Sequence, residues 1–364
     1  AVGIGNEAGS EGRARRSGRV RKGRMGAAVR TLAFPPPNTI SLMPVTNLPS
    51  IVDDLFVAYA TGAKPFIKWA GGKGQLLSQF QSHYPSGLVS GEITTYVEPF
   101  MGGAAVFFDV VQKFPGLRRA FLFDINPELV LTYNVVKRDL GGLLTILSRF
   151  EQDYLRLASV DRKVMFYEVR EMYNSSRAAI DFDEYNSKWI RRAAQMIFLN
   201  KTCFNGLFRL NSKGGFNTPS GDYANPTICD RGALARASET LGIASIERSS
   251  FDALLSKEID FADSFVYLDP PYRPLSRTAS FTAYSAEAFG DAEQIRLRDV
   301  FASLSEQAAS VMVSNSDPKV SDPDDQFFDN LYNGFHIHRV VANRMINSKA
   351  ENRGPITEIL VKNY

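Results

Sequence analysis

An acidic residue, two prolines and a tyrosine follow one apolar stretch and form the segment best suited to chemistry. The stretch at 265–268 is typical of a strand, and Asp269, Pro270, Pro271 and Tyr272 come directly after it. Two successive prolines cannot continue a central strand, so the chain must turn out there. The Asp269 carboxylate and the Pro270 carbonyl could accept hydrogens from the amino group of a flipped-out nucleobase or an amide, while Tyr272 stacks on the ring. Alternatively, the prolines only end the strand and Tyr272 packs in the core.

A glycine turn follows an earlier strand-like stretch at 94–97. Phe100 precedes the turn, and Gly102 and Gly103 carry no Cβ, so the backbone can approach a ligand closely. Asp124 ends the next strand-like stretch, where a carboxylate could bind both hydroxyls of a ribose. A plain tight turn and a helix-capping aspartate are the alternatives.

Cationic and aromatic residues occur ahead of the first strand and after the third. Lys68, Trp69 and Lys73 surround a glycine-rich turn whose spacing does not fit an ATP-binding loop. A cation and an indole instead suit the carboxylate and methionyl end of an amino-acid-like cofactor. Phe251 and Asp252 follow the third strand-like stretch and could sandwich and hydrogen-bond an adenine, although Phe251 would suit ordinary core equally.

Strand-like and helix-like stretches alternate from about residue 57, which is typical of a doubly wound α/β sheet. Between residues 140 and 200 the chain is expected to be largely helical. The predicted strands cover 94–97, 120–123, 244–246, 265–268, 310–314, 336–342 and 357–361. Because successive strands of such a sheet present their tips to one crevice, the groups described above should meet there.

Residues 200–223 interrupt this alternation with Asn, Gly, Ser and Lys between scattered Phe and Leu. The segment is too irregular for core and too aromatic for a linker. We therefore expect an exposed recognition segment that contains a hairpin.

Positive charge is concentrated at the start of the sequence. The first 32 residues hold eight Arg and Lys against two Glu, whereas the rest holds 34 basic and 37 acidic residues. Any nucleic acid should therefore be contacted through a local patch of the folded part. We expect residues 1–50 to be a disordered tail, interpreted as sequence ahead of a start at Met25 or Met43. A nonspecific DNA-binding arm and a targeting peptide are the alternatives.

Cys203 and Cys229 are too few for a disulfide framework and lack the spacing of a metal site. We therefore expect a reducing compartment, the cytoplasm, and no metal. No stretch is long and apolar enough to predict a membrane span.

The order of these motifs resembles the Dam-type class (class alpha, D12) of DNA adenine-N6 methyltransferases, in which an FxGG-like cofactor motif precedes a target-recognition insertion and DPPY comes last. The likeness runs from about residue 65 onward and includes PFIKWAGGKGQLL and FLNKTCFNGLFRLNSKGGFN. Ala104 stands where many members carry a third glycine. The resemblance implies a doubly wound mixed sheet of the Rossmann-like methyltransferase fold, with a catalytic domain at 57–140 and 241–364 and a helical insertion with a DNA-recognition hairpin at 141–240.

The resemblance also implies S-adenosylmethionine as methyl donor and a flipped-out adenine of double-stranded DNA as acceptor, within a GAT-containing site such as GATC. The adenine-holding, catalytic residues would be Asp269, Pro270, Pro271 and Tyr272. The cofactor-binding residues would be Trp69, Lys73, Phe100, Gly102, Gly103, Asp124, Phe251, Asp252 and Asp269. The DNA-binding residues would be Lys68, Asn205, Leu207, Arg209 and Pro219. Members that read GATC carry an arginine where this chain has Asp222, so the prediction covers only the first three bases.

Two other activities fit part of the pattern. One keeps the cofactor but methylates RNA or a protein amide; Asp269, where protein-glutamine methylases use Asn, and the long insertion argue against it. The other is a catalytically inactive DNA-binding relative, which the intact DPPY and Lys73 oppose. We expect a monomer associated with the nucleoid through DNA; the sequence does not indicate whether a cognate restriction endonuclease exists.

Overall fold

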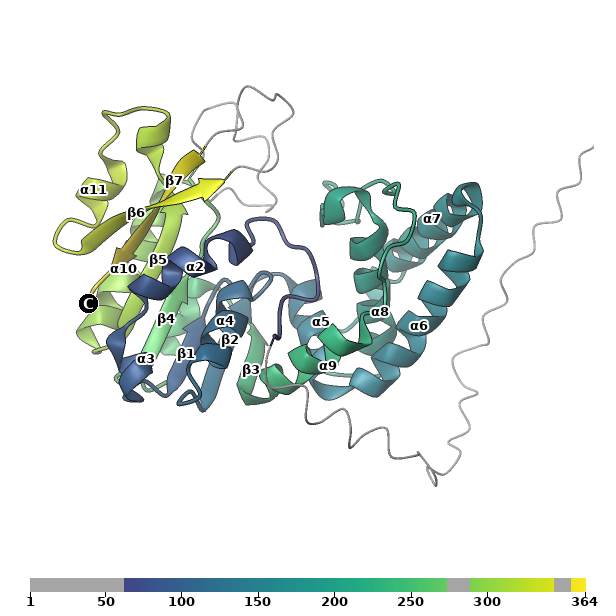
Figure 1. Cartoon of the computed structure of the whole chain (residues 1–364), viewed down its shortest axis with the longest axis horizontal. Coiled ribbons are helices and arrows are strands. Elements are labelled where there is room, and N and C mark those ends of the chain that lie inside the picture. The colour runs from purple at the N-terminus through teal and green to yellow at the C-terminus, as the bar shows by residue number, and fades with distance from the viewer. Residues whose placement is uncertain (1–61, 274–288, 344–354) are drawn as a thin grey trace, which may run out of the picture. The chain divides into compact units, whose positions relative to one another are not determined.

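The computed structural model describes residues 62–273, 289–343 and 355–364, and the expected basic tail at 1–50 lies outside them. A seven-stranded sheet is the central element of this part (Figure 1). Its strands are β1 (Thr95–Glu98), β2 (Arg119–Asp124), β3 (Ala244–Arg248), β4 (Ser264–Leu268), β5 (Ser310–Ser316), β6 (His336–Asn343) and β7 (Pro355–Lys362). Each predicted strand is thus confirmed, with ends that differ by a few residues.

The strand order is β3-β2-β1-β4-β5-β7-β6. The first five strands are parallel neighbours, whereas β7 pairs antiparallel with both β5 and β6. The predicted mixed α/β sheet is therefore confirmed. Because β3, β2, β1 and β4 run in the same direction, the loops after them leave at one edge of the sheet.

Helices connect and cover these strands (Figure 1). They are α2 (Leu77–Phe80), α3 (Ser86–Ser90), α4 (Ala105–Lys113), α5 (Pro127–Arg138), α6 (Leu140–Arg156), α7 (Ser159–Ser175), α8 (Lys188–Thr202), α9 (Arg231–Thr240), α10 (Asp291–Glu306) and α11 (Phe327–Leu331). Short 3-10 turns at Lys73–Gln75 (η1), Phe204–Gly206 (η4) and Phe251–Ser256 (η6) carry several of the predicted site residues.

The central strand β4 is buried along its whole length because both faces of the sheet are covered. Phe265 and Tyr267 belong to the hydrophobic core that includes α4 and α5. Val266 and Leu268 point to the opposite face and join the core formed with α10 and α11. This alternation follows from the two-residue period of side chains along a strand. Asp269 comes directly after the last residue of β4, at the carboxyl end of that strand.

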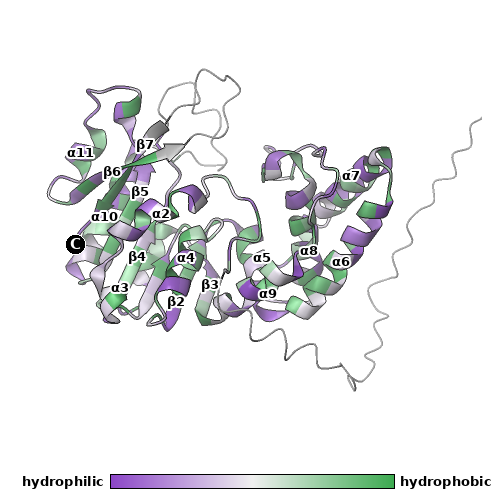
Figure 2. Ribbon diagram, in the orientation of Figure 1, coloured by the Kyte–Doolittle hydropathy of each residue, from purple (hydrophilic) through white to green (hydrophobic). Residues whose placement is uncertain are grey.

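The expected helical stretch consists of α6, α7 and α8, which pack on one another, with α6 and α8 also contacting α5. Both hydrophobic and hydrophilic residues occur along α6 (Figure 2), and Leu143, Leu147 and Phe150 form its buried stripe. Arg192 of α8 donates hydrogen bonds to both carboxylate oxygens of Glu128 on α5, and both side chains are buried. This ion pair ties the helical layer to the sheet domain.

All described residues belong to one compact unit, Ile51–Tyr364. No helix within the described ranges is both long enough and apolar enough to cross a membrane.

Candidate active site

Four groups of predicted site residues meet at the carboxyl edge of the sheet. Asp124 is the last residue of β2, while residues 100–103, 251–252 and 269–272 follow β1, β3 and β4, respectively. These strands are adjacent and parallel, so the groups lie along one edge. The structure therefore brings the groups together, while their individual roles stay predictions.

Asp269 is fixed from two sides. The Nζ of Lys73 lies 2.7 Å from its Oδ1 and 2.8 Å from its Oδ2, and it also donates to the Gly71 carbonyl at 2.8 Å. The Ser314 hydroxyl donates to Asp269 Oδ1 at 3.0 Å and lies 2.8 Å from the Tyr267 hydroxyl. Ser314 and Tyr267 are fully buried, whereas the Asp269 side chain is 19% exposed. The contacts with Lys73 and Ser314 therefore fix the orientation of the Asp269 carboxylate, and part of its side chain remains exposed to solvent.

The rest of the corner differs in exposure from residue to residue. Pro270 is buried, Pro271 is exposed and Tyr272 is half-buried. The Tyr272 hydroxyl donates to the Glu358 carboxylate of β7, and Lys73 Nζ lies 4.6 Å from the centre of the Tyr272 ring. Burial, with the neighbouring carboxylates, raises the pKa of Tyr272, so its hydroxyl remains a donor. The corner therefore lies at the surface of the sheet edge rather than inside the core.

Asp124 organises the glycine turn. Its Oδ2 accepts the Gly102 N–H at 2.9 Å and its Oδ1 accepts the Asn126 N–H at 2.8 Å. Gly102 has a φ of +47°, and a Cβ there would meet the Trp69 ring at 3.0 Å, so glycine is strongly favoured. Burial raises the pKa of Asp124 to about 6, although the hydrogen bonds from the two N–H groups lower it. Asp124 does not cap α5, because the cap is Asn126, whose side chain accepts from the Glu128 N–H.

Phe100 and Phe251 form an aromatic wall beside this turn. Their rings are stacked with centroids 5.4 Å apart. Phe251 is only 6% exposed and belongs to the core, while Phe100 is half-buried. Asp252 is exposed and lies 3.6 Å from Arg296. Phe100 is therefore the ring of this pair that is more accessible to a ligand.

Residues 200–223 contain the expected hairpin, with antiparallel bridges at Cys203–Ser220 and Leu210–Phe216. Arg209 is exposed and donates from Nε to the Asn217 side chain at 2.8 Å. Leu207 is half-buried. The hairpin thus presents a guanidinium whose other nitrogens make no hydrogen bond among the described residues.

Two backbone positions shape the turn of η4. Asn205 has a φ of +57°, and its N–H donates to the Tyr223 hydroxyl at 3.1 Å. The Pro219 carbonyl accepts the Phe204 N–H at 2.9 Å. Phe204, which we did not single out from the sequence, is 53% exposed. The turn therefore projects an aromatic ring and an amide to the surface.

Asn200 joins Lys68 to this segment. Its side chain accepts the Lys68 N–H at 2.9 Å and donates to the carbonyls of Lys68 and Gly206, at 2.8 and 3.0 Å. Gly206 has a φ of +68°, and a Cβ there would lie 2.5 Å from Lys68 Cδ. The structure therefore places Lys68 directly against the hairpin. Asn200 was missed because it appears in the sequence only as one more polar residue at a helix end.

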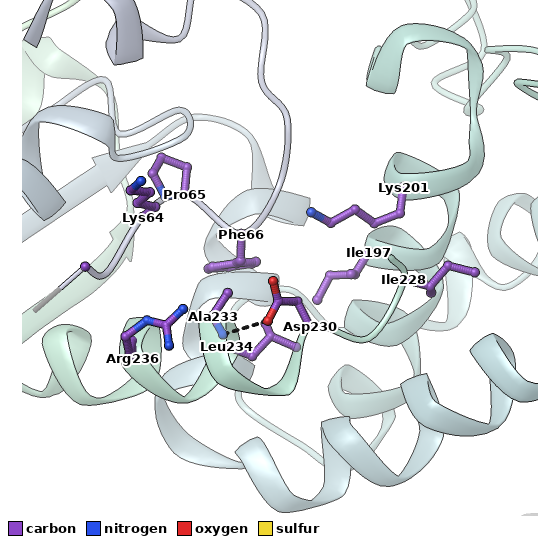
Figure 3. A pocket seen from close by; sticks show the side chains of 11 residues that line it. Lys64, Pro65, Phe66, Ile197, Lys201, Ile228, Asp230, Ala233, Leu234 and Arg236 are labelled. Carbon is purple, nitrogen blue, oxygen red and sulfur yellow. Dashed lines mark hydrogen bonds between the residues drawn. The ribbon is translucent and has the colours of Figure 1, made fainter. Parts of the chain in front are cut away.

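A separate cavity of about 220 Å³ contains none of the predicted site residues (Figure 3). Its lining includes Lys64, Phe66, Lys201, Asp230 and Arg236. The Asp230 side chain caps α9 by accepting the Ala233 N–H at 2.9 Å. In the described part of the chain, no group of three or more His, Cys, Asp or Glu side chains could hold a metal ion.

A mixed sheet with a glycine turn, a strand-end acid and an Asp-Pro-Pro-Tyr corner at the carboxyl ends of its parallel strands is consistent with an α/β methyltransferase. The family model of D12 class N6 adenine-specific DNA methyltransferases matches residues 69–346, and the chain belongs to this family. It is accordingly an enzyme that methylates adenine in DNA.

Named relatives are similar over most of their length. Type II methyltransferase M.MjaIII of Methanocaldococcus jannaschii is 44% identical over 302 residues, covering 83% of this chain and 99% of the relative. Type II methyltransferase M1.LlaDCHI of Lactococcus lactis subsp. cremoris is 36% identical, with 83% and 95% covered. The DNA adenine methylase of Escherichia coli K12 is 31% identical, with 82% and 94% covered.

Proposed function

We propose that the protein transfers the methyl group of S-adenosylmethionine to N6 of an adenine flipped out of double-stranded DNA. The observation that carries this proposal is the oriented Asp269 carboxylate at the tip of β4, beside the Pro270 carbonyl and the Tyr272 ring. Extrusion is needed because the amino group of a paired adenine is inaccessible inside the duplex.

The corner can make N6 nucleophilic. The adenine amino lone pair is delocalised into its ring, and hydrogen bonds from N6 to the Asp269 carboxylate and the Pro270 carbonyl would localise it on nitrogen. Stacking on Tyr272 would hold the plane of the base. Asp269 need not act as a strong base, because the proton can leave after transfer. Alignment and exclusion of water then supply most of the rate.

The residues at the sheet edge fit S-adenosylmethionine, which supplies an electrophilic methyl group on a sulfonium. Asp124 can accept from ribose hydroxyls while it holds the glycine turn. Lys73 offers a buried cation for the amino-acid carboxylate, and Asp269 offers a counter-charge for its amino group. Trp69 and Phe100 add apolar walls. Gly102 and Gly103 would keep the backbone open to the cofactor, whereas Phe251 and Asp252 would contribute less, since one is buried and the other faces Arg296.

Base recognition is assigned to the hairpin and Lys68. Arg209 can bind a guanine through two nitrogens, Asn205 can pair with a base edge, and Leu207 can contact a thymine methyl. These residues suit a GAT-containing site. Exposed Asp222 cannot donate to guanine; it would repel phosphate or accept from a cytosine amino group, so the proposal covers only the first three bases. Pro219 supports the turn through its carbonyl. Such an enzyme would work at the nucleoid.

Replacement of Asp269 by Ala tests the proposal. We expect methylation to be abolished, measured as tritiated methyl transfer from S-adenosylmethionine to plasmid DNA, because N6 loses its charged acceptor. DNA binding should stay within a few-fold. Asp299→Ala, at an exposed carboxylate on α10, serves as control. Substantial turnover by Asp269→Ala would contradict the role, and sequencing of the methylated DNA would identify the target.

A further inference from the structure

Glu358 is a carboxylate that the chemistry above does not use. It lies on β7, where the three residues that follow it, 359–361, are buried and apolar. Glu358 itself is half-buried and faces the Asp269 corner through its contact with Tyr272. A partly desolvated acid costs stability unless a specific interaction offsets the loss of water. Its contact with Tyr272 is such an interaction.

The two partners differ in how firmly their backbones are held. Glu358 sits in an interior strand, paired with Ser316 of β5 on one side and Val340 of β6 on the other. Tyr272 lies in the loop after β4 and makes no strand pairing. Its ring is contacted by the Glu358 carboxylate at the hydroxyl and by Lys73 at 4.6 Å from the ring centre. The sheet therefore fixes the orientation of a loop side chain.

We propose that Glu358 is a positioning residue that holds the Tyr272 ring in the orientation required for stacking on the extruded adenine. This inference rests on the proposed function, because it assigns Tyr272 to the base. In this arrangement Glu358 acts on the base through the phenol hydroxyl of Tyr272.

The surrounding charges suit this role. Burial raises the pKa of Glu358, Asp269 raises it further, and both Lys73 and the bond from Tyr272 lower it. Burial raises the pKa of Tyr272 as well, so the phenol donates and the carboxyl oxygen accepts. An acceptor oxygen is all that the geometry requires, so a glutamine carbonyl should substitute for the carboxylate.

A double-mutant cycle tests the inference with full-length protein. Glu358→Ala should lower kcat for duplex DNA by about tenfold to hundredfold, the range for a lost hydrogen bond to a charged group. Tyr272→Phe keeps the ring but removes the hydroxyl and should give a similar fall. The double variant should be no slower than either single variant, because one bond is lost in all three. Glu358→Gln should stay within about fivefold of wild type.

Two measurements separate positioning from a structural defect. Duplex DNA with 2-aminopurine at the target base should show altered fluorescence in the Glu358→Ala complex, while S-adenosylmethionine affinity is unchanged. Glu306→Ala, at an exposed carboxylate at the end of α10, is the matched control. Should Glu358→Ala fail to fold, Tyr272→Phe and Glu358→Gln are compared directly: Tyr272→Phe should lose about tenfold to hundredfold in kcat while Glu358→Gln stays within about fivefold of wild type, and equal losses in the two would overturn the inference.

The inference would be overturned if the fall in kcat of the double variant were the product of the two single falls. It would also be overturned if Glu358→Ala kept the wild-type kcat, or if Glu358→Gln lost as much activity as Glu358→Ala. The proposed function fails separately, if Asp269→Ala remains active.

Discussion

Replacing Arg192 by Met should destabilise the protein by about 3 kcal/mol, at the lower end of the range for breaking a buried ion pair. The Arg192 side chain is 1% exposed and also donates to the Tyr173 carbonyl at 2.9 Å. Its loss leaves Glu128 buried with only Arg177, at 3.7 Å and 42% exposed, as a partial substitute. For a chain of this size the midpoint of thermal unfolding should fall by roughly 4–5 °C.

Urea unfolding followed by circular dichroism would measure the loss. Arg192→Met combined with Glu128→Gln should recover about 1–2 kcal/mol relative to Arg192→Met alone, because no unpaired charge remains. Lys188→Met, at an exposed cation on the same helix, should change stability by less than about 0.5 kcal/mol. A loss below about 1 kcal/mol for Arg192→Met, or strict additivity in the double variant, would refute the reasoning.

The other predictions concern the cofactor and the DNA. Because burial raises the pKa of Asp124 to about 6, its carboxyl ionises between about pH 5 and 7, and S-adenosylmethionine affinity in calorimetry should increase over that interval. Stability should change in the opposite sense, decreasing as pH rises from about 4 to 6, since the folded state holds this proton more tightly than the unfolded chain. Asp124→Asn should weaken cofactor binding at least about tenfold and remove the pH dependence; a flat wild-type profile would contradict this. Arg209→Ala should lower discrimination at one base by about 1–3 kcal/mol in methylation of oligonucleotides with single substitutions, and an unchanged preference would place the readout elsewhere.

Much of the fold could be predicted because its signals are local. The apolar run at 265–268 lies in a strand covered on both faces, and the two prolines that follow mark the strand end. The parallel order then implies that the glycine turn, Asp124 and Asp269 share one edge. These inferences need only short segments of sequence and the topology rules of α/β sheets.

The contacts that complete the site could not be predicted, because they join residues far apart in the chain. Tyr272 and Glu358 are 86 positions apart, and Lys68 and Asn200 are 132 apart. The residues that flank Tyr272 or Lys68 in the sequence do not indicate which distant residue each of them contacts. Phe251 illustrates the converse: an aromatic residue after a strand suits both a ligand and a core, and only its burial distinguishes them.

The position of β7 has a consequence for the assembly of the protein. β6 precedes β7 in the chain, yet β7 lies between β5 and β6 in the sheet. β6 therefore cannot join the sheet before β7, which must pair with β5 either before β6 or together with it. Until β7 pairs with β5, the backbone N–H and C=O groups on that side of β5 are unpaired and can bind other chains. Partly assembled protein should thus be prone to association and less active, since Glu358, which contacts the Tyr272 hydroxyl, arrives with β7.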